Sequence, residues 1–184
     1  HTHTVRGQYG PGKKTDGKNA AGYRQEPDVS PNSGTETFGC LKLFIDNWRW
    51  EGVPIYLRSG KSLWKRGTEI MVQFKQAPDI LNRGSNVQNR GEPNRLIFHI
   101  QPFQGVEIRM QAKRPGPTFQ LQRAGMRFDY AETFEASRGT GYEVLLYSAL
   151  AGDPTLFSRT DFVEASWRIM QPVLDAWRTT PADD

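Results

Sequence analysis

The chain has 184 residues, of which 36% are hydrophobic and 24% are charged, and its formal net charge is +4. This length suffices for one domain with a sizeable core, and the 5 Trp, 6 Tyr and 10 Phe favour a globular fold over a disordered segment. A net charge this small is compatible with either nucleic acid or a small anion as the partner and favours neither.

Cysteine and histidine usage limits the chemistry further. The single cysteine, Cys40, excludes an internal disulfide and indicates a reducing, cytoplasmic compartment. With one Cys and three scattered His, no zinc site of the usual spacing is expected. No apolar run approaches the ~20 residues that cross a bilayer, so no membrane partner is expected either.

The chain divides by composition near residue 36. Residues 1–36 are predicted to form an irregular arm, because this segment is rich in Gly, Pro, Lys, Asn and Asp. Residues 37–184 are predicted to form a sheet and helices. Short apolar runs or alternation of apolar and polar residues predict strands at residues 38–45, 53–57, 70–75, 96–101 and 106–113, the last two joined as a hairpin. Further strands are indicated by Phe119, Leu121 and Phe128.

Two helices are predicted after these strands. Residues 142–150 are apolar enough for a buried helix, which Gly152 and Pro154 would stop. Thr160 is expected to cap the next helix, and Pro172 is expected to kink or split it near Met170. The predicted fold class is therefore α+β, a large mostly antiparallel β-sheet with helices packed on one face.

A group of basic residues follows the second predicted strand. Ser59 and Gly60 are expected to form a turn there, because glycine tolerates positive φ. Arg58, Lys61 and Arg66 then offer donors that suit a phosphate group. Such a turn is able to receive a phosphorylated small molecule, although charge alone favours a solvated surface loop.

Sequence motifs along nearly the whole chain occur in the order of a known family. The central run is FIDNWRWEGVPIYLRSGK at residues 44–61, followed by TEIMVQF at residues 68–74. Its flanks are VRGQY at 5–9, GYR at 22–24, TETF at 35–38, NRLIF at 94–98, IQP at 100–102 and SWRIMQPVL at 166–174. Together these motifs resemble the C-terminal part of glucose-6-phosphate dehydrogenase.

The resemblance implies a function for the complete enzyme. That enzyme would oxidise glucose 6-phosphate to 6-phosphogluconolactone with NADP, the first step of the pentose phosphate pathway. Residues 1–184 would be its C-terminal substrate-binding and oligomerisation domain, with a homodimer or tetramer formed through the sheet. In bacterial enzymes of this type, two basic residues five apart contact glucose 6-phosphate, which implies that Lys61 and Arg66 bind the substrate.

The catalytic chemistry of that family is expected to lie outside this chain. The family's histidine base stands in the motif DHYLGKE, which does not occur here, and His99 is interpreted as a sheet-face side chain. Gly139 and Gly141 lack the third glycine and the βαβ setting of a dinucleotide fingerprint. No catalytic, cofactor-binding or metal-binding residue is therefore assigned. NADP is expected to bind mainly to an N-terminal Rossmann domain, and the chain alone is expected to be inactive.

A second, structural NADP is held in this domain by animal enzymes of the family. Arg58, Gln101 and Arg109 match some of its contacts. The positions that depart from the animal pattern are Gly67, Met71, His99 and Gly141. The resemblance therefore favours the bacterial type, without this second site.

One alternative function remains open, a stand-alone, non-catalytic sugar-phosphate-binding or protein-interaction domain. Binding to single-stranded nucleic acid would require aromatic side chains on a basic face. The alternation places most aromatic residues here on the same side as the apolar core residues, so no nucleic-acid partner is expected.

Overall fold

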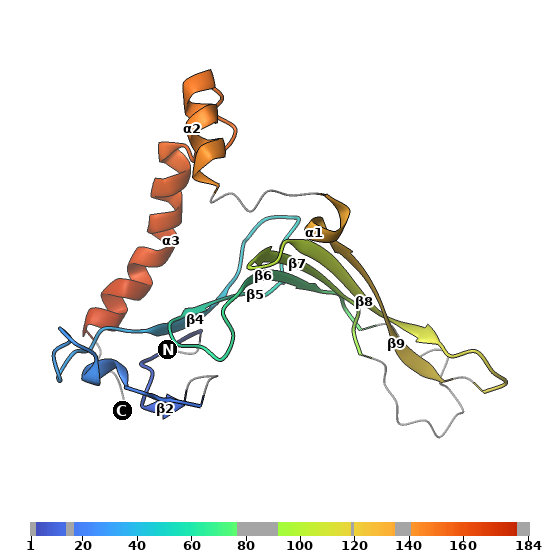
Figure 1. Ribbon diagram of the computed structural model, residues 1–184, viewed down its shortest axis with the longest axis horizontal. Coiled ribbons are helices and arrows are strands. Elements are labelled where there is room, and N and C mark those ends of the chain that lie inside the picture. Colours follow the sequence, from blue (N-terminus) through green and yellow to red (C-terminus); the bar gives the residue numbers. More distant parts are fainter. Residues whose placement is uncertain (1–2, 14–16, 77–91, 119, 135–140, 180–184) are drawn as a thin grey trace. The chain divides into compact units, whose positions relative to one another are not determined.

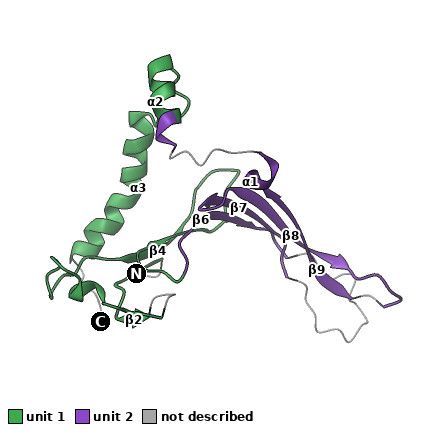
Figure 2. Cartoon of the chain, viewed as in Figure 1, with its two compact units in different colours: residues 1–64, 144–184 green, residues 65–143 purple. Residues whose placement is uncertain are grey.

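The computed structural model describes residues 3–13, 17–76, 92–118, 120–134 and 141–179, in two compact units (Figures 1 and 2). The first unit contains residues 1–64 and 144–184, and the second contains residues 65–143. The described strands form three antiparallel sheets of three, two and four strands.

The first unit is built around the three-stranded sheet. Its order is β1 (Thr4–Gly7), β4 (Phe38–Leu43) and β5 (Ile55–Gly60), so that β4 lies in the middle. Leu41 of β4 pairs with residues on both neighbours and is 3% exposed. Between β1 and β4 the chain forms a short hairpin, β2 (Gly12–Lys13) with β3 (Asn19–Ala20), and then the 3-10 helix η1 (Tyr23–Gln25).

Helix α3 (Thr160–Thr179) contacts one face of this sheet through its C-terminal turn. The Trp177 ring lies against Gly39 of β4, where an added Cβ would be 3.2 Å from the ring. The Arg6 guanidinium on β1 lies 5.8 Å from the centroid of the same ring. Because Arg6 pairs with Gly39, both residues present the same face of the sheet to Trp177.

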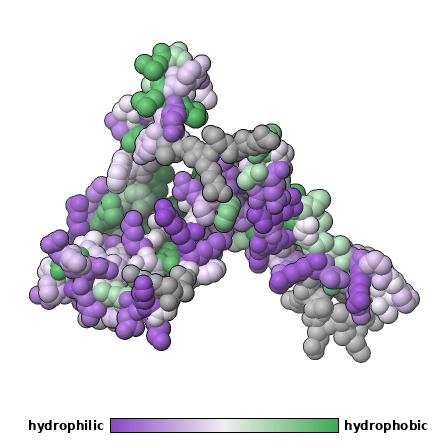
Figure 3. Space-filling view, in the orientation of Figure 1, coloured by the Kyte–Doolittle hydropathy of each residue, from purple (hydrophilic) through white to green (hydrophobic). Residues whose placement is uncertain are grey.

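Helix α2 (Tyr142–Ala151) carries large apolar side chains that are exposed in this structure. Leu146, Tyr147 and Leu150 have 65%, 74% and 90% of their surface exposed, and hydrophobic side chains gather over this helix in Figure 3. An apolar helix of this kind is typical of a protein interior.

Of the helices that the structure describes, none combines the length and the apolar character needed to cross a membrane.

The second unit is a four-stranded antiparallel meander followed by a short helix. The strands lie in chain order, β6 (Thr68–Gln73), β7 (Arg95–Gln101), β8 (Gly105–Lys113) and β9 (Leu121–Asp129). Asp129 caps the helix α1 (Tyr130–Thr133), because its carboxylate accepts a hydrogen bond from the backbone N–H of Ala131 at 2.9 Å.

The four-stranded sheet has one apolar face and one polar face, since side chains alternate along each strand. The register places on the apolar face Ile70, Val72, Leu96, Phe98, Val106, Ile108, Met110, Met126 and Phe128. The opposite face carries Glu69, Met71, Arg95, Ile97, His99, Glu107, Arg109, Arg123 and Arg127. Several apolar-face side chains are exposed, which makes this face a candidate contact surface.

The predicted fold class, α+β with mostly antiparallel strands, is confirmed. The strands are divided among three sheets, and α3 is the described helix that packs against the three-stranded one. The range 1–36 contains β1, the β2–β3 hairpin and η1. Of the kink or split predicted at Pro172, the split is wrong, because α3 continues through this residue. Of the three residues that indicate further strands, Leu121 and Phe128 lie in β9, and Phe119 lies outside the described residues.

Candidate functional site

The basic segment follows strand β5, which extends further than the sequence predicts. Ser59 and Gly60 pair with β4, so the predicted turn at these two residues is wrong. Gly60 lies close to its partner, and a Cβ there would be 2.9 Å from the Phe38 ring and 3.3 Å from the Thr37 carbonyl oxygen. The chain instead has its left-handed residue at Ser62, with φ of 52°.

Lys61 is the first residue after β5, and its backbone is fixed. Its N–H donates to the carbonyl oxygen of Thr37 at 2.8 Å. The side chain is exposed, and nothing in the described part of the chain forms an ion pair with its ammonium. An exposed cation on an ordered backbone is suited to bind an anionic group.

The other two basic residues lie in different settings. Arg58 pairs with Cys40 inside the sheet, so it belongs to strand β5 and not to the predicted turn. Arg66 lies in the second unit, is exposed, and pairs with no carboxylate among the residues described. The neighbouring Lys65 lies 3.9 Å from Glu69. The two residues expected to bind substrate, Lys61 and Arg66, therefore belong to the first and the second unit, respectively.

A charged network lies on the polar face of the four-stranded sheet. His99 Nε2 lies 3.3 Å from Glu107 Oε2, and His99 Nδ1 lies 3.9 Å from Glu69 Oε2. Arg109 binds both oxygens of Glu107, with Nε at 2.6 Å and Nη2 at 2.9 Å. The sequence predicts His99 on a strand, and the structure places it in β7, where its neighbours on β6 and β8 are carboxylates.

The hydrogen bonds between Arg109 and Glu107 shift the pKa of both groups. The hydrogen bond from Arg109 is the main cause that lowers the pKa of the Glu107 carboxyl below its usual range, although desolvation opposes it. The same bond raises the pKa of the Arg109 guanidinium. Because Glu107 is already bound by Arg109, the pair of His99 and Glu107 is part of an ionic network that stabilises the sheet. The sequence signal for this network was the (i, i+2) spacing of Glu107 and Arg109 in a predicted strand.

Two other kinds of site are relevant to the described residues, a metal site and the family's second NADP site. Within the described ranges, no group of three His, Cys, Asp or Glu side chains could hold a metal ion. Gly141 has φ of 82° and directly precedes α2, whereas Gly139 lies outside the described residues. Met71 and His99, which depart from the animal pattern, share the polar sheet face with Arg109.

Comparison with known proteins gives one family. The family described as glucose-6-phosphate dehydrogenase, C-terminal domain, matches residues 1–183. The glucose-6-phosphate 1-dehydrogenase of Mycolicibacterium smegmatis is 43% identical over 175 residues, which cover 95% of this chain and 34% of the relative. That of Aggregatibacter actinomycetemcomitans is 45% identical over 171 residues, covering 93% and 33%. The chain thus spans about a third of the length of the curated relatives it matches.

Solved structures show the same likeness. A glucose-6-phosphate dehydrogenase in complex with its substrate glucose-6-phosphate superposes with a TM-score of 0.77 at 31% identity, covering 94% of this chain and 34% of that one. The glucose-6-phosphate 1-dehydrogenase of Mycobacterium avium gives a TM-score of 0.73 at 35% identity, covering 98% and 35%.

Proposed function

This chain belongs to the family of glucose-6-phosphate dehydrogenase C-terminal domains, and from this membership we propose that it is the substrate-contacting part of an NADP-dependent glucose-6-phosphate dehydrogenase. The complete enzyme oxidises C1 of glucose 6-phosphate to give 6-phosphogluconolactone, and NADP⁺ accepts the hydride. The catalytic base and the cofactor site lie outside residues 1–184. By itself, the chain is inactive.

The role of this chain is to hold the phosphorylated substrate. The proposal rests on the setting of Lys61, which directly follows strand β5. Its side chain is an exposed cation, and its backbone N–H is hydrogen-bonded to the carbonyl oxygen of Thr37. Lys61 and Arg66 donate charge-assisted hydrogen bonds to phosphate or sugar oxygens of the substrate. A relative of the same fold whose structure is described with glucose-6-phosphate bound supports this choice of ligand.

A test changes Lys61 in the complete enzyme that carries this chain. Lys61→Ala removes one charge-assisted hydrogen bond, and such bonds contribute about 1.5–3 kcal/mol. We expect the KM for glucose 6-phosphate to rise roughly 10- to 100-fold while the KM for NADP⁺ stays unchanged. Steady-state kinetics with each substrate varied in turn provides the measurement.

Lys65→Ala is the matched control, because Lys65 lies in the same basic segment but near Glu69. Its KM for glucose 6-phosphate should change less than about twofold, as expected for an exposed ion pair. Equal effects of the two variants would indicate a general effect of charge. An unchanged KM in Lys61→Ala would remove Lys61 from the substrate site.

Two further properties belong to the same proposal. The complete enzyme is a homo-oligomer that uses the four-stranded sheet as a subunit contact, and exposed apolar side chains on that sheet support this. The enzyme acts in the cytoplasm, which the single unpaired cysteine of this chain supports. The exposed apolar helix α2 favours a part of a larger protein over a stand-alone binding domain.

A further inference from the structure

Three strand ends meet beside Lys61. Strand β1 ends at Gly7, β4 begins at Phe38 and β5 ends at Gly60, and the register pairs Phe38 with both glycines. Thr37 is the residue before β4, and Lys61 is the residue after β5. Thr37 therefore lies between the chain that leaves β1 and the chain that leaves β5.

Every polar group of Thr37 is used at this point. Its N–H donates to the Gly7 carbonyl oxygen at 2.9 Å, and its carbonyl oxygen accepts from the Lys61 N–H at 2.8 Å. Its hydroxyl oxygen Oγ1 accepts from the backbone N–H of Tyr9 at 2.9 Å. The two backbone bonds are open to any residue, whereas the third bond requires a hydroxyl side chain.

Tyr9 extends this contact to the next residue of the basic segment. Its hydroxyl donates to Glu26 Oε1 at 3.5 Å and also interacts with the side chain of Ser62. Its ring packs edge-on against Tyr23, with the ring centroids 5.8 Å apart. Ser62 has φ of 52°, a left-handed conformation that costs a residue with a Cβ some stability. The contact with Tyr9 supports Ser62 in this conformation.

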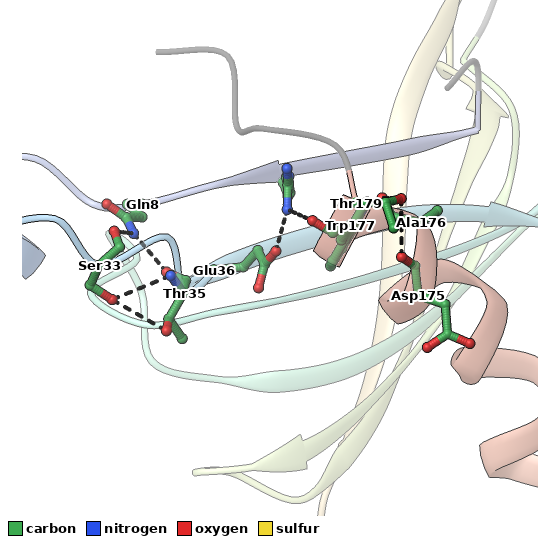
Figure 4. Close-up of polar contacts among 9 residues, drawn as sticks. Gln8, Ser33, Thr35, Glu36, Asp175, Ala176, Trp177 and Thr179 are labelled. Atoms are coloured by element: carbon green, nitrogen blue, oxygen red, sulfur yellow. Dashed lines mark hydrogen bonds and ion pairs between the residues drawn. The ribbon is translucent and has the colours of Figure 1, made fainter.

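The segment before Thr37 is anchored as well. The Gln8 side chain donates from Nε2 to the carbonyl oxygens of Ser33 and Thr35, each at 2.8 Å (Figure 4). Gln8 and Tyr9 are consecutive, so one stretch of chain holds both the approach to Thr37 and the residue after Lys61.

We infer that Thr37 and Tyr9 are positioning residues for substrate binding, which fix Lys61 from both sides before the phosphate arrives. This inference rests on the proposed function of Lys61. Thr37 bonds to the backbone N–H of Lys61, and the Thr37 hydroxyl holds Tyr9 against Ser62. A basic segment that is already ordered before the ligand arrives loses less conformational entropy when the ligand binds. Without the Thr37 hydroxyl, Lys61 keeps its charge, but its backbone and side chain are held less firmly in position.

The test compares hydroxyl and isosteric side chains in the complete enzyme. Thr37→Val removes only the hydroxyl, and we expect the KM for glucose 6-phosphate to rise about 3- to 10-fold, as for the loss of one hydrogen bond. The kcat and the KM for NADP⁺ should stay within about twofold. Thr37→Ser restores the hydroxyl and should restore the KM. Tyr9→Phe, which removes the contacts of the hydroxyl with Ser62 and Glu26, should raise the KM in the same direction.

Thr35→Val is the matched control, because the Thr35 hydroxyl contacts only Ser33 among the described side chains. It should leave the KM unchanged. If Thr37→Val and Tyr9→Phe both leave the KM unchanged while Lys61→Ala raises it, the positioning role is overturned and the proposed function stands. If Lys61→Ala itself has no effect, the proposed function fails first.

A double variant separates positioning from general loss of structure. In the Lys61→Ala background, Thr37→Val should have no further effect on the KM, because the group that it positions is gone. Full additivity of the two changes would overturn the inference. A fall in the kcat or the thermal stability of Thr37→Val well beyond that of Thr35→Val would indicate a general loss of structure and would overturn the inference as well.

Discussion

Glu107 joins Arg109 and His99 on the polar face of the four-stranded sheet. Its carboxylate is bound by both Nε and Nη2 of Arg109 and lies 3.3 Å from His99 Nε2. The side chain is 23% exposed, so the bond to Arg109 is partly shielded from water. The bond from Arg109 lowers the pKa of Glu107, which means that folding favours its ionised form.

We therefore expect Glu107→Gln to lower stability in a pH-dependent way. Above the ordinary pKa of a glutamate, the variant should be less stable by about 1 kcal/mol, since it loses the charge of this bond. As the pH falls through the ordinary pKa and then through the lowered folded pKa, the carboxyl of the native protein takes up a proton. The difference between native and variant protein should then disappear.

Urea unfolding of the complete enzyme between pH 7 and pH 3 provides this measurement. Glu51→Gln is the control, because Glu51 is exposed and forms no ion pair with the part of the chain that is described. A constant difference between Glu107→Gln and native protein at all pH values would show that the ionised form of Glu107 is not what stabilises the sheet.

At the scale of elements, one aromatic residue joins α3 to the three-stranded sheet. Trp177 contacts Gly39 with its ring, and its carbonyl oxygen accepts a hydrogen bond from Arg6 at 2.7 Å. The same nitrogen of Arg6 lies 2.5 Å from a carboxylate oxygen of Glu36 (Figure 4). Arg6, which is largely buried, thus connects β1, the segment before β4 and the end of α3.

Trp177→Ala should loosen the end of α3 from the sheet. The ring is half-buried, so we expect a loss of about 1–3 kcal/mol, below the range for a fully buried aromatic residue. Hydrogen exchange should become faster at residues 173–179 and in β1 and β4. Trp48→Ala serves as the control, since Trp48 is 86% exposed in a turn. Unchanged exchange in α3 after Trp177→Ala would show that other contacts hold the helix.

Strands were predictable where one face of a sheet is apolar. In β7 and β8, alternation placed Leu96, Phe98, Val106 and Ile108 together, and the register confirms the hairpin. The end of β5 was not predictable, because glycine in a sequence indicates a turn, whereas Gly60 is required by the closeness of the Phe38 ring. Such closeness depends on the partner strand. Pro172 was expected to kink or split the last helix, and α3 is not split there.

The residues proposed to bind substrate were predictable only in part from the sequence. Lys61 and Arg66 came from the resemblance to a family, since charge alone favoured a solvated loop. Thr37 had no sequence signal, because it lies 24 residues before Lys61 and 28 residues after Tyr9, and the register of three strands brings them together. Contacts that depend on sheet register are visible only after the strands are paired.

At the scale of the whole molecule, the apolar face of the four-stranded sheet requires a covering surface. Ile70, Met126 and Ile100 are 57%, 59% and 42% exposed on it. The opposite face also carries an exposed methionine, Met71 at 53%, which pairs with Ile97 and has Glu69 and Gln73 as its neighbours along the strand. Since burial of apolar area favours association by about 25 cal/mol per Å², we expect the apolar face to form the contact between two subunits.

Two matched substitutions test which face of the sheet joins the subunits. Met126→Glu places a charge on the apolar face, where burial in an interface would desolvate the carboxylate. We expect the dissociation constant of the oligomer to rise by about 100-fold or more, measured by sedimentation of the complete enzyme at several concentrations. Met71→Glu adds the same charge to the polar face and should leave the constant within about threefold. If only Met71→Glu dissociates the enzyme, the polar face forms the contact. If neither does, the subunits join elsewhere, and the apolar face is covered by another part of the same complete chain.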